Sequence, residues 1–213
     1  MTCIVAIKTK NRVLMMGDSL GGCLADYSVT MRRDPKVFRC GDLVIGHTTS
    51  FRMAQLVRFG LHSALDVSEL KPPADPGDGL RFMVRDFVPR VRHVFDEGGF
   101  TQEHRGQERG GEMLVAWGAQ LFGVQSDFNV QDFAEDFAAA GCGTPYALGA
   151  LSATASEEPA RRAVIALRAA AHFSAFVRAP FIGMETTGSE LDPVAIGAAG
   201  STAAPEPVGS NTP

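Results

Sequence analysis

Several features that would mark a membrane, secreted or nucleic-acid-binding protein are missing from this sequence. No apolar run approaches the ~20 residues that a transmembrane helix needs, and we expect no signal peptide before Thr2. The net charge of −4 offers no basic surface for nucleic acid or an anionic membrane, so neither is an expected partner. Cysteine is scarce and shows no CxxC spacing. We expect a cytoplasmic protein with reduced thiols at Cys3, Cys23, Cys40 and Cys142.

Signals for a bound cofactor are missing as well. The glycine pairs Gly21-Gly22 and Gly98-Gly99 are not followed by the Lys-Ser or Lys-Thr pair of a phosphate-binding loop. No group of histidine, cysteine and carboxylate residues has the spacing of metal ligands. We therefore expect neither a cofactor nor a metal ion.

Large apolar side chains become rare toward the C-terminal end. Residues 186–213 are rich in Gly, Ala, Ser, Thr and Pro and cannot bury a core. We expect this stretch to be a disordered low-complexity tail. Residues 2–185 are then expected to form one domain, which is long enough for a sizeable hydrophobic core.

Hydrophobic periodicity divides the domain into strands and helices. Apolar runs predict strands at 3–7, 13–16, 36–40, 43–46, 112–118, 120–125 and 181–184. Helical spacing predicts helices at 51–65, 80–97, 142–154 and 156–176, the second bent by Pro89 and the last capped by Ser156. Residues 66–79 and 101–111 are predicted to be loops, and 20–31 a loop or irregular strand. Strands kept apart from helix pairs predict an α+β fold, with two packed sheets between two helical layers.

The first strand begins at a residue with catalytic potential. Met1 precedes a small residue, which is the situation in which an initiator Met is normally removed, leaving Thr2 first. Thr2 would then carry a hydroxyl beside a free α-amine with a pKa of about 7.7–8.0. A neutral amine beside a hydroxyl is a general base beside a nucleophile. The same hairpin also fits an ordinary strand start, so this stretch by itself leaves both interpretations open.

Five ordered features carry a resemblance to a known family. They are Thr2, Asp18-Ser19, Lys36-Val37, Gly46-His47-Thr48-Thr49-Ser50 and Gly141-Cys142-Gly143-Thr144-Pro145-Tyr146-Ala147. In this order, from residue 2 to about 182, the chain resembles the proteasome β-subunit family, including its bacterial relative HslV. The resemblance implies the four-layer αββα sandwich of the N-terminal-nucleophile (Ntn) hydrolases.

The resemblance also implies a role for each matched residue. Asp18 and Lys36 form an ion pair beside the catalytic threonine, where the cation favours a neutral amine. The backbone N–H of Ser50, where the family usually has glycine, stabilises the oxyanion. Cys142 stands where the family has a serine that assists proton transfer, and Ser174 matches a late serine near the amine.

Some features depart from the family or need a separate interpretation. A thiol at position 142 is a weaker hydrogen-bond donor than a hydroxyl. The family's late aspartate has no counterpart here, and His172 is not taken as its replacement. Cys3 could be mistaken for a nucleophile, but we expect it to pack or hydrogen-bond in the core.

Together these features predict a threonine-type peptidase subunit of a self-compartmentalising assembly that cleaves peptides or unfolded proteins. The family implies a homo-oligomer of rings, and an ATP-driven unfoldase partner stays open because no residue indicates one. Two alternatives remain at this point. One is an Ntn amidase that acts on a small amide, and the other is a catalytically inactive assembly subunit whose Thr2 stays blocked.

Overall fold

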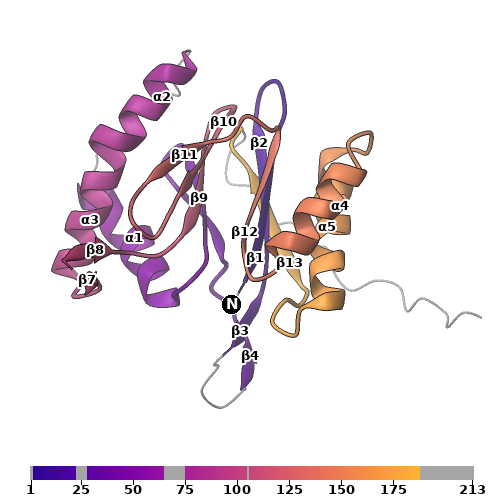
Figure 1. Cartoon of the computed structure of the whole chain (residues 1–213), viewed down its shortest axis with the longest axis horizontal. Helices are drawn as coiled ribbons and strands as arrows, with labels where there is room; N and C mark the ends of the chain where they lie inside the picture. The colour runs from indigo at the N-terminus through magenta and orange to yellow at the C-terminus, as the bar shows by residue number, and fades with distance from the viewer. Residues whose placement is uncertain (1, 23–27, 65–74, 105, 188–213) are drawn as a thin grey trace, which may run out of the picture.

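Two β-sheets lie face to face between two layers of helices in the computed structural model of the chain (Figure 1). The structure describes residues 2–22, 28–64, 75–104 and 106–187. The helix–sheet–sheet–helix order confirms the predicted α+β sandwich. Most of the low-complexity tail, Met1 and Cys23 lie outside the described residues.

The first sheet positions the start of the chain. Its four antiparallel strands follow the order β12 (Phe137–Gly141), β1 (Cys3–Lys8), β2 (Val13–Asp18) and β13 (Phe181–Glu185). Side chains alternate along β1 because successive residues of a strand point to opposite faces. Cys3 and Val5 pack against the helices, whereas Ile4 and Ala6 pack between the two sheets. The same alternation directs Thr2 toward the space between the sheets.

The second sheet supplies the other wall of that space. Its order is β11 (Val130–Asp132), β10 (Gln120–Val124), β9 (Met113–Trp117), β6 (Leu43–His47) and β5 (Val37–Cys40). The sheets approach closely at Gly46, where an added Cβ would lie 2.6 Å from the sulfur of Met15. A side chain at position 46 would therefore push the two sheets apart.

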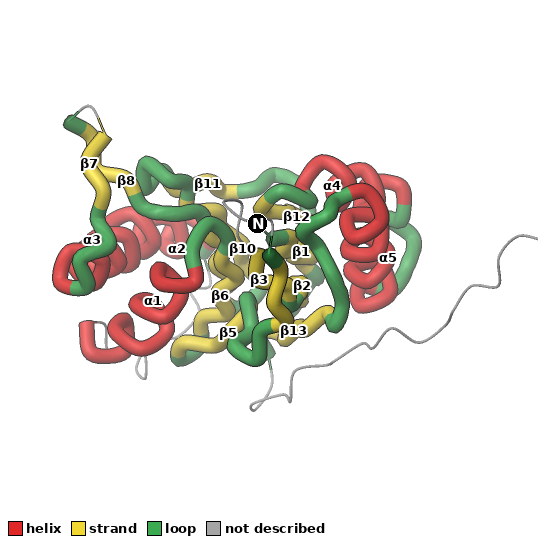
Figure 2. The backbone as a smooth tube through the Cα atoms, turned by 90° about the horizontal axis from the view of Figure 1, so that it is seen from below, coloured by secondary structure: helices red, strands yellow, loops and turns green. Residues whose placement is uncertain are grey.

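Helices cover the outer face of each sheet (Figures 1 and 2). The first sheet is covered by α4 (Thr144–Ala153) and α5 (Pro159–Phe173). The second is covered by α1 (Phe51–Ala64), α2 (Pro76–Phe82), η1 (Met83–Phe87) and α3 (Val88–Glu97). The predicted N-cap of α5 at Ser156 is wrong. Glu158 caps this helix instead, because its carboxylate accepts hydrogen bonds from the N–H groups of Ala160 and Arg161.

The helical segment around Pro89 starts earlier than predicted. Asp75 caps its first turn by accepting a hydrogen bond from Gly77, and Pro76 suits the first helical position. Residues 76–79 are therefore helical rather than part of the predicted loop, whose residues 66–74 lie outside the described residues, as does the predicted end of the preceding helix at 65. The backbone widens to a π-helix at η1, which ends two residues before Pro89, and a proline removes one helical N–H donor.

Two short hairpins complete the architecture. The exposed loop predicted at 101–111 is wrong, because β7 (Gln102–His104) pairs with β8 (Gln107–Arg109). The irregular stretch at 20–31 contains β3 (Leu20–Gly22) paired with β4 (Val29–Met31), and residues 23–27 lie outside the described part. β7 and β8 contain no apolar residue, and β3 and β4 are only three residues long, so neither hairpin contains the apolar run from which strands are predicted.

The folded part of the chain extends slightly beyond the predicted domain end. The N–H of Thr186 donates to the carbonyl oxygen of Val13 at 3.0 Å. The Thr186 hydroxyl accepts from the N–H of Val13 and donates to the carbonyl oxygen of Gly118. Thr186 therefore ties the end of β13 to both sheets.

Candidate active site

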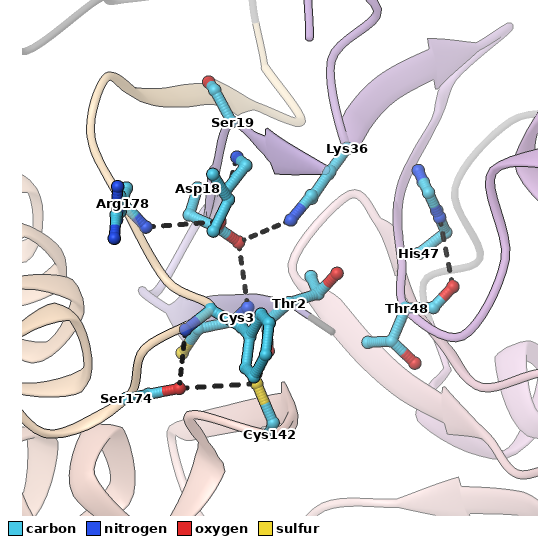
Figure 3. Close-up of polar contacts among 12 residues, drawn as sticks. Thr2, Cys3, Asp18, Ser19, Lys36, His47, Thr48, Cys142, Ser174 and Arg178 are labelled. Atoms are coloured by element: carbon cyan, nitrogen blue, oxygen red, sulfur yellow. Dashed lines mark hydrogen bonds and ion pairs between the residues drawn. The ribbon is translucent and has the colours of Figure 1, made fainter. Parts of the chain in front are cut away.

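A buried ion pair lies beside the start of β1. The ammonium Nζ of Lys36 is 2.8 Å from Oδ1 of Asp18, and the exposed fractions of the two side chains are 1% and 0%. Asp18 also accepts hydrogen bonds from the N–H groups of Cys3 at 3.0 Å and Leu20 at 3.1 Å. Figure 3 shows Lys36 reaching from the second sheet toward the region above Thr2. The sequence-predicted residues Thr2, Asp18 and Lys36 are thus brought together.

Burial and charge act in opposite directions on Lys36. Burial lowers the pKa of the Lys36 ammonium, and the neighbouring Asp18 carboxylate opposes this change. The carboxylate is needed because an isolated buried ammonium is very costly. The Asp18 carboxylate therefore stabilises the ammonium form of Lys36 near Thr2.

Cys142 and Ser174 approach Thr2 from the side of the molecule on which α4 and α5 lie. Strand β12 pairs with β1 so that Gly141 lies opposite Cys3. The Cys142 thiol then donates to the carbonyl oxygen of Thr2 at 3.4 Å. Its sulfur is 3.6 Å from the hydroxyl oxygen of Ser174, the C-cap residue that follows α5 (Figure 3). Five of the six sequence-predicted residues therefore gather around the start of β1.

The sixth residue, Ser50, has a structural role in a tight turn. Its N–H donates to the carbonyl oxygen of Thr48 at 2.6 Å, across Thr49, whose φ is 55°. The Ser50 hydroxyl accepts from the N–H groups of Arg52 and Met53 and so caps α1. The N–H that the sequence suggested as the oxyanion donor is therefore engaged within this turn.

Sequence reasoning did not single out His47, which is part of this site. Its side chain is 2% exposed, and its ring contacts the ring of Phe51 edge-on at 5.4 Å. Burial lowers the pKa of His47 to about 4, so the imidazole is neutral at pH 7. Nδ1 lies 3.2 Å from the carbonyl oxygen of Thr48, whereas Nε2 has no partner among the described residues. Two signals were available: its place in the segment Gly46–Ser50 that carries the family resemblance, and a polar residue at the end of the strand Leu43–His47.

The buried imidazole predicts a loss of stability in acid. A pKa of about 4 in the folded state lies below the ordinary value of 6.5, so the unfolded chain binds the proton more readily. Stability is lost as the pH falls from 6.5 toward 4, and this residue accounts for about 2 kcal/mol between pH 7 and pH 5. Between pH 7 and pH 5 we expect the free energy of unfolding of His47→Phe to fall by about 2 kcal/mol less than that of the wild type. Denaturant unfolding at both pH values measures the difference.

His93 provides the matched control for this prediction. It is an exposed histidine on α3, 3.5 Å from Glu97. The His93→Phe variant should keep the acid sensitivity of the wild type. An equal loss of stability in wild type and in His47→Phe would show that the buried imidazole does not cause it.

Cys3 is the buried cysteine of the site. Its side chain is fully buried, and burial is the main reason why its pKa is raised to about 12. A thiol with such a pKa is not a nucleophile at neutral pH. The expectation that Cys3 packs in the core is confirmed.

Two further features of the described residues bear on chemistry. No group of three or more His, Cys, Asp or Glu side chains in this part of the chain could hold a metal ion. None of the described helices has the length and apolar character required to cross a membrane.

The layer order and the buried start of β1 define the class of fold to which this chain belongs, the proteasome-type Ntn-hydrolase sandwich. The chain is similar to Thiobacillus denitrificans BPH, at 24% identity and a TM-score of 0.66, over 86% of this chain and 96% of that one. It is similar to eukaryotic HslV from Trypanosoma brucei, at 17% identity and a TM-score of 0.59, over 86% and 98% of the two chains. It also resembles a Gly-1 mutant of Anbu from Hyphomicrobium sp. strain MC1, at 14% identity and a TM-score of 0.66, over 93% and 88%.

These neighbours confirm the fold implied by the resemblance to proteasome β-subunits and HslV. No family model matches the sequence, and no match to it was found among curated proteins.

Proposed function

We propose that this chain is a threonine-type peptidase subunit in which Thr2, freed by removal of Met1, is the nucleophile. The observation that carries the proposal is the buried Asp18–Lys36 pair at the start of β1. A cation buried beside a strand start has no packing role that an apolar side chain could not fill. A complex of Thiobacillus denitrificans BPH with epoxomicin, in a structure 22% identical to this chain, also supports a ligand site on this fold.

The proposed reaction proceeds in two steps. The α-amine takes the proton from the Thr2 hydroxyl, and the oxygen attacks the carbonyl carbon of the substrate amide. The resulting ammonium gives the proton to the leaving amine as the C–N bond breaks, leaving an ester on Thr2. Water, activated by the same amine, then hydrolyses the ester and restores the free hydroxyl.

The surrounding residues support this role of the amine. The Lys36 charge favours the neutral form of a nearby amine and stabilises a developing alkoxide. Asp18 accepts hydrogen bonds from both the Lys36 ammonium and the N–H of Cys3. The position of the cation relative to the start of β1 is therefore fixed. The Cys142 thiol and the Ser174 hydroxyl form a weak hydrogen-bonded path beside Thr2 that can assist proton transfer.

The turn before α1 offers an oxyanion donor other than Ser50. The N–H groups of His47, Thr48 and Ser50 donate to the carbonyl oxygens of Lys36, Glu112 and Thr48 respectively. The N–H of Thr49 has no acceptor among the described residues. Its positive φ of 55° is uncommon for a non-glycine residue and is typical of functional turns. We assign the oxyanion to the N–H of Thr49.

A peptidase of this kind requires that its site be enclosed, and we propose a homo-oligomeric ring assembly. Both helical layers carry exposed apolar side chains. In the layer that contains α1 and η1 these are Phe59 (72% exposed) and Val84 (51%), and in the layer that contains α5 it is Phe173 (66%). Such side chains favour interfaces between copies. Peptides or unfolded proteins would be the substrates, and an ATP-driven unfoldase partner stays open.

Light scattering tests the assembly. We expect roughly twelve or more copies, because a heterologous contact that closes into rings and an isologous contact that stacks them generate such numbers. Phe59→Asp should lower the mass of the assembly and leave the fold of the chain intact. A monodisperse and fully active monomer would contradict the enclosed chamber and favour an amidase that acts on small amides.

A further inference from the structure

A pocket adjoins the candidate active site on the β12 side. Its volume is about 210 Å³, enough for one side chain of a substrate rather than for a folded partner. One wall contains Gly141 and Thr144, which flank Cys142. The facing wall contains Glu112 and Leu114, beside the turn that precedes α1. Figure 2 shows the start of the chain near β12 and the β10–β11 edge of the second sheet.

The pocket has an apolar floor and a polar rim. Leu114 belongs to the cluster between the two sheets, and Phe133 and Ala140 pack against that cluster. Glu112, the residue directly before β9, lines the same pocket as Leu114. Gln125 lines the same pocket and donates to the side chain of Gln131, another lining residue, at 3.3 Å.

Glu112 is the one charged residue among those that line the pocket. Within the described part of the chain its carboxylate forms no salt bridge. Its backbone is fixed, because its carbonyl oxygen accepts from the N–H of Thr48 at 3.0 Å and its N–H donates to the Thr49 hydroxyl at 3.2 Å. The position of Glu112 is therefore coupled to the proposed oxyanion turn.

We propose that this pocket is a substrate subsite that selects a lysine or arginine directly after the scissile bond. The apolar floor suits the aliphatic part of such a side chain, and the rim pairs its charge with Glu112. We place the pocket on the side of the leaving group because two of its lining residues, Gly141 and Thr144, flank Cys142. The Cys142 thiol donates a hydrogen bond to the carbonyl oxygen of Thr2. The inference rests on the proposed peptidase function.

Three peptides that differ only in the residue after the scissile bond test the subsite. This residue is lysine, norleucine or glutamate, and mass spectrometry of the products identifies the bond that is cut. For the wild type we expect kcat/KM to be about 10-fold higher for lysine than for norleucine, the size of one favourable charged contact. Glu112→Gln should reduce this ratio to near one. Glu112→Lys should reverse the preference in favour of glutamate.

Glu97→Gln is the matched control, because Glu97 is an exposed carboxylate at the end of α3. It should keep the wild-type ratio. Norleucine cleavage by the wild type shows that the peptidase function is present, independently of the subsite. Equal cleavage of the three peptides, or a lysine preference that survives in Glu112→Gln, would overturn the subsite alone. A wild type that cuts none of the peptides would overturn the peptidase function and the subsite together.

Discussion

Replacing Thr2 with alanine is expected to lower kcat/KM for peptide hydrolysis by at least about 1,000-fold, the size typical for loss of a nucleophile. The substitution removes the attacking oxygen and leaves the α-amine, since alanine is also small enough for removal of Met1. The fold should persist because Thr2 precedes β1 and the Asp18 contact uses the N–H of Cys3. Hydrolysis of a fluorogenic peptide measures the loss, and the thermal midpoint measures the fold.

Thr2→Ser is the matched control for this substitution. It keeps a hydroxyl beside a free α-amine, so measurable activity should remain. A Thr2→Ala protein that retains more than a tenth of the wild-type rate would exclude Thr2 as the nucleophile. A Thr2→Ala protein that is inactive but unfolded would be uninformative, and the thermal midpoint identifies that case.

Replacing Lys36 with methionine is expected to reduce peptide hydrolysis nearly as strongly. The change removes the buried charge near Thr2 and keeps most of the side-chain volume. It also leaves the Asp18 carboxylate buried without its cation, which costs about 3–5 kcal/mol of stability. A lower activity of this variant alone therefore does not separate a catalytic role from a structural one.

The double variant Asp18→Asn with Lys36→Met separates these roles. It removes both charges, so most of the lost unfolding free energy should return, because a buried pair replaced by neutral groups is often close to neutral in stability. Peptide hydrolysis should remain near the level of the Lys36→Met single variant. Recovery of activity together with stability would show that the ion pair only supports the fold.

One part of the site was predictable because it depends on a hairpin whose two strands are near in sequence. Asp18 ends the second strand of the first hairpin, so pairing with β1 brings it back to the start of the chain. Cys142 follows β12, a strand that the apolar pattern did not predict, and the pairing of β12 with β1 places its thiol next to Thr2. The places of Cys142 and Ser174 followed only from the family resemblance.

The remaining features depend on tertiary context that the sequence pattern does not contain. From the sequence, the N–H of Ser50 was expected to be available to the oxyanion. In the structure it donates to the carbonyl oxygen of Thr48 within the turn. His47 looked like the end of a strand, and its burial depends on Phe51 and the second sheet. The strands of the hairpin at 102–109 contain no apolar residue, so alternation of apolar and polar residues could not predict them.

The most direct test of the proposed mechanism frees the N-terminus of one chain. A removable domain fused before Thr2 blocks the α-amine, and cleavage directly before Thr2 releases it. A released chain that is then acetylated on Thr2 carries only a small block and serves as the control for steric hindrance. We predict that hydrolysis appears in step with the mass of the chain that begins at Thr2 and is absent from the fusion and the acetylated chain. Equal activity before release, after release and after acetylation would contradict the mechanism.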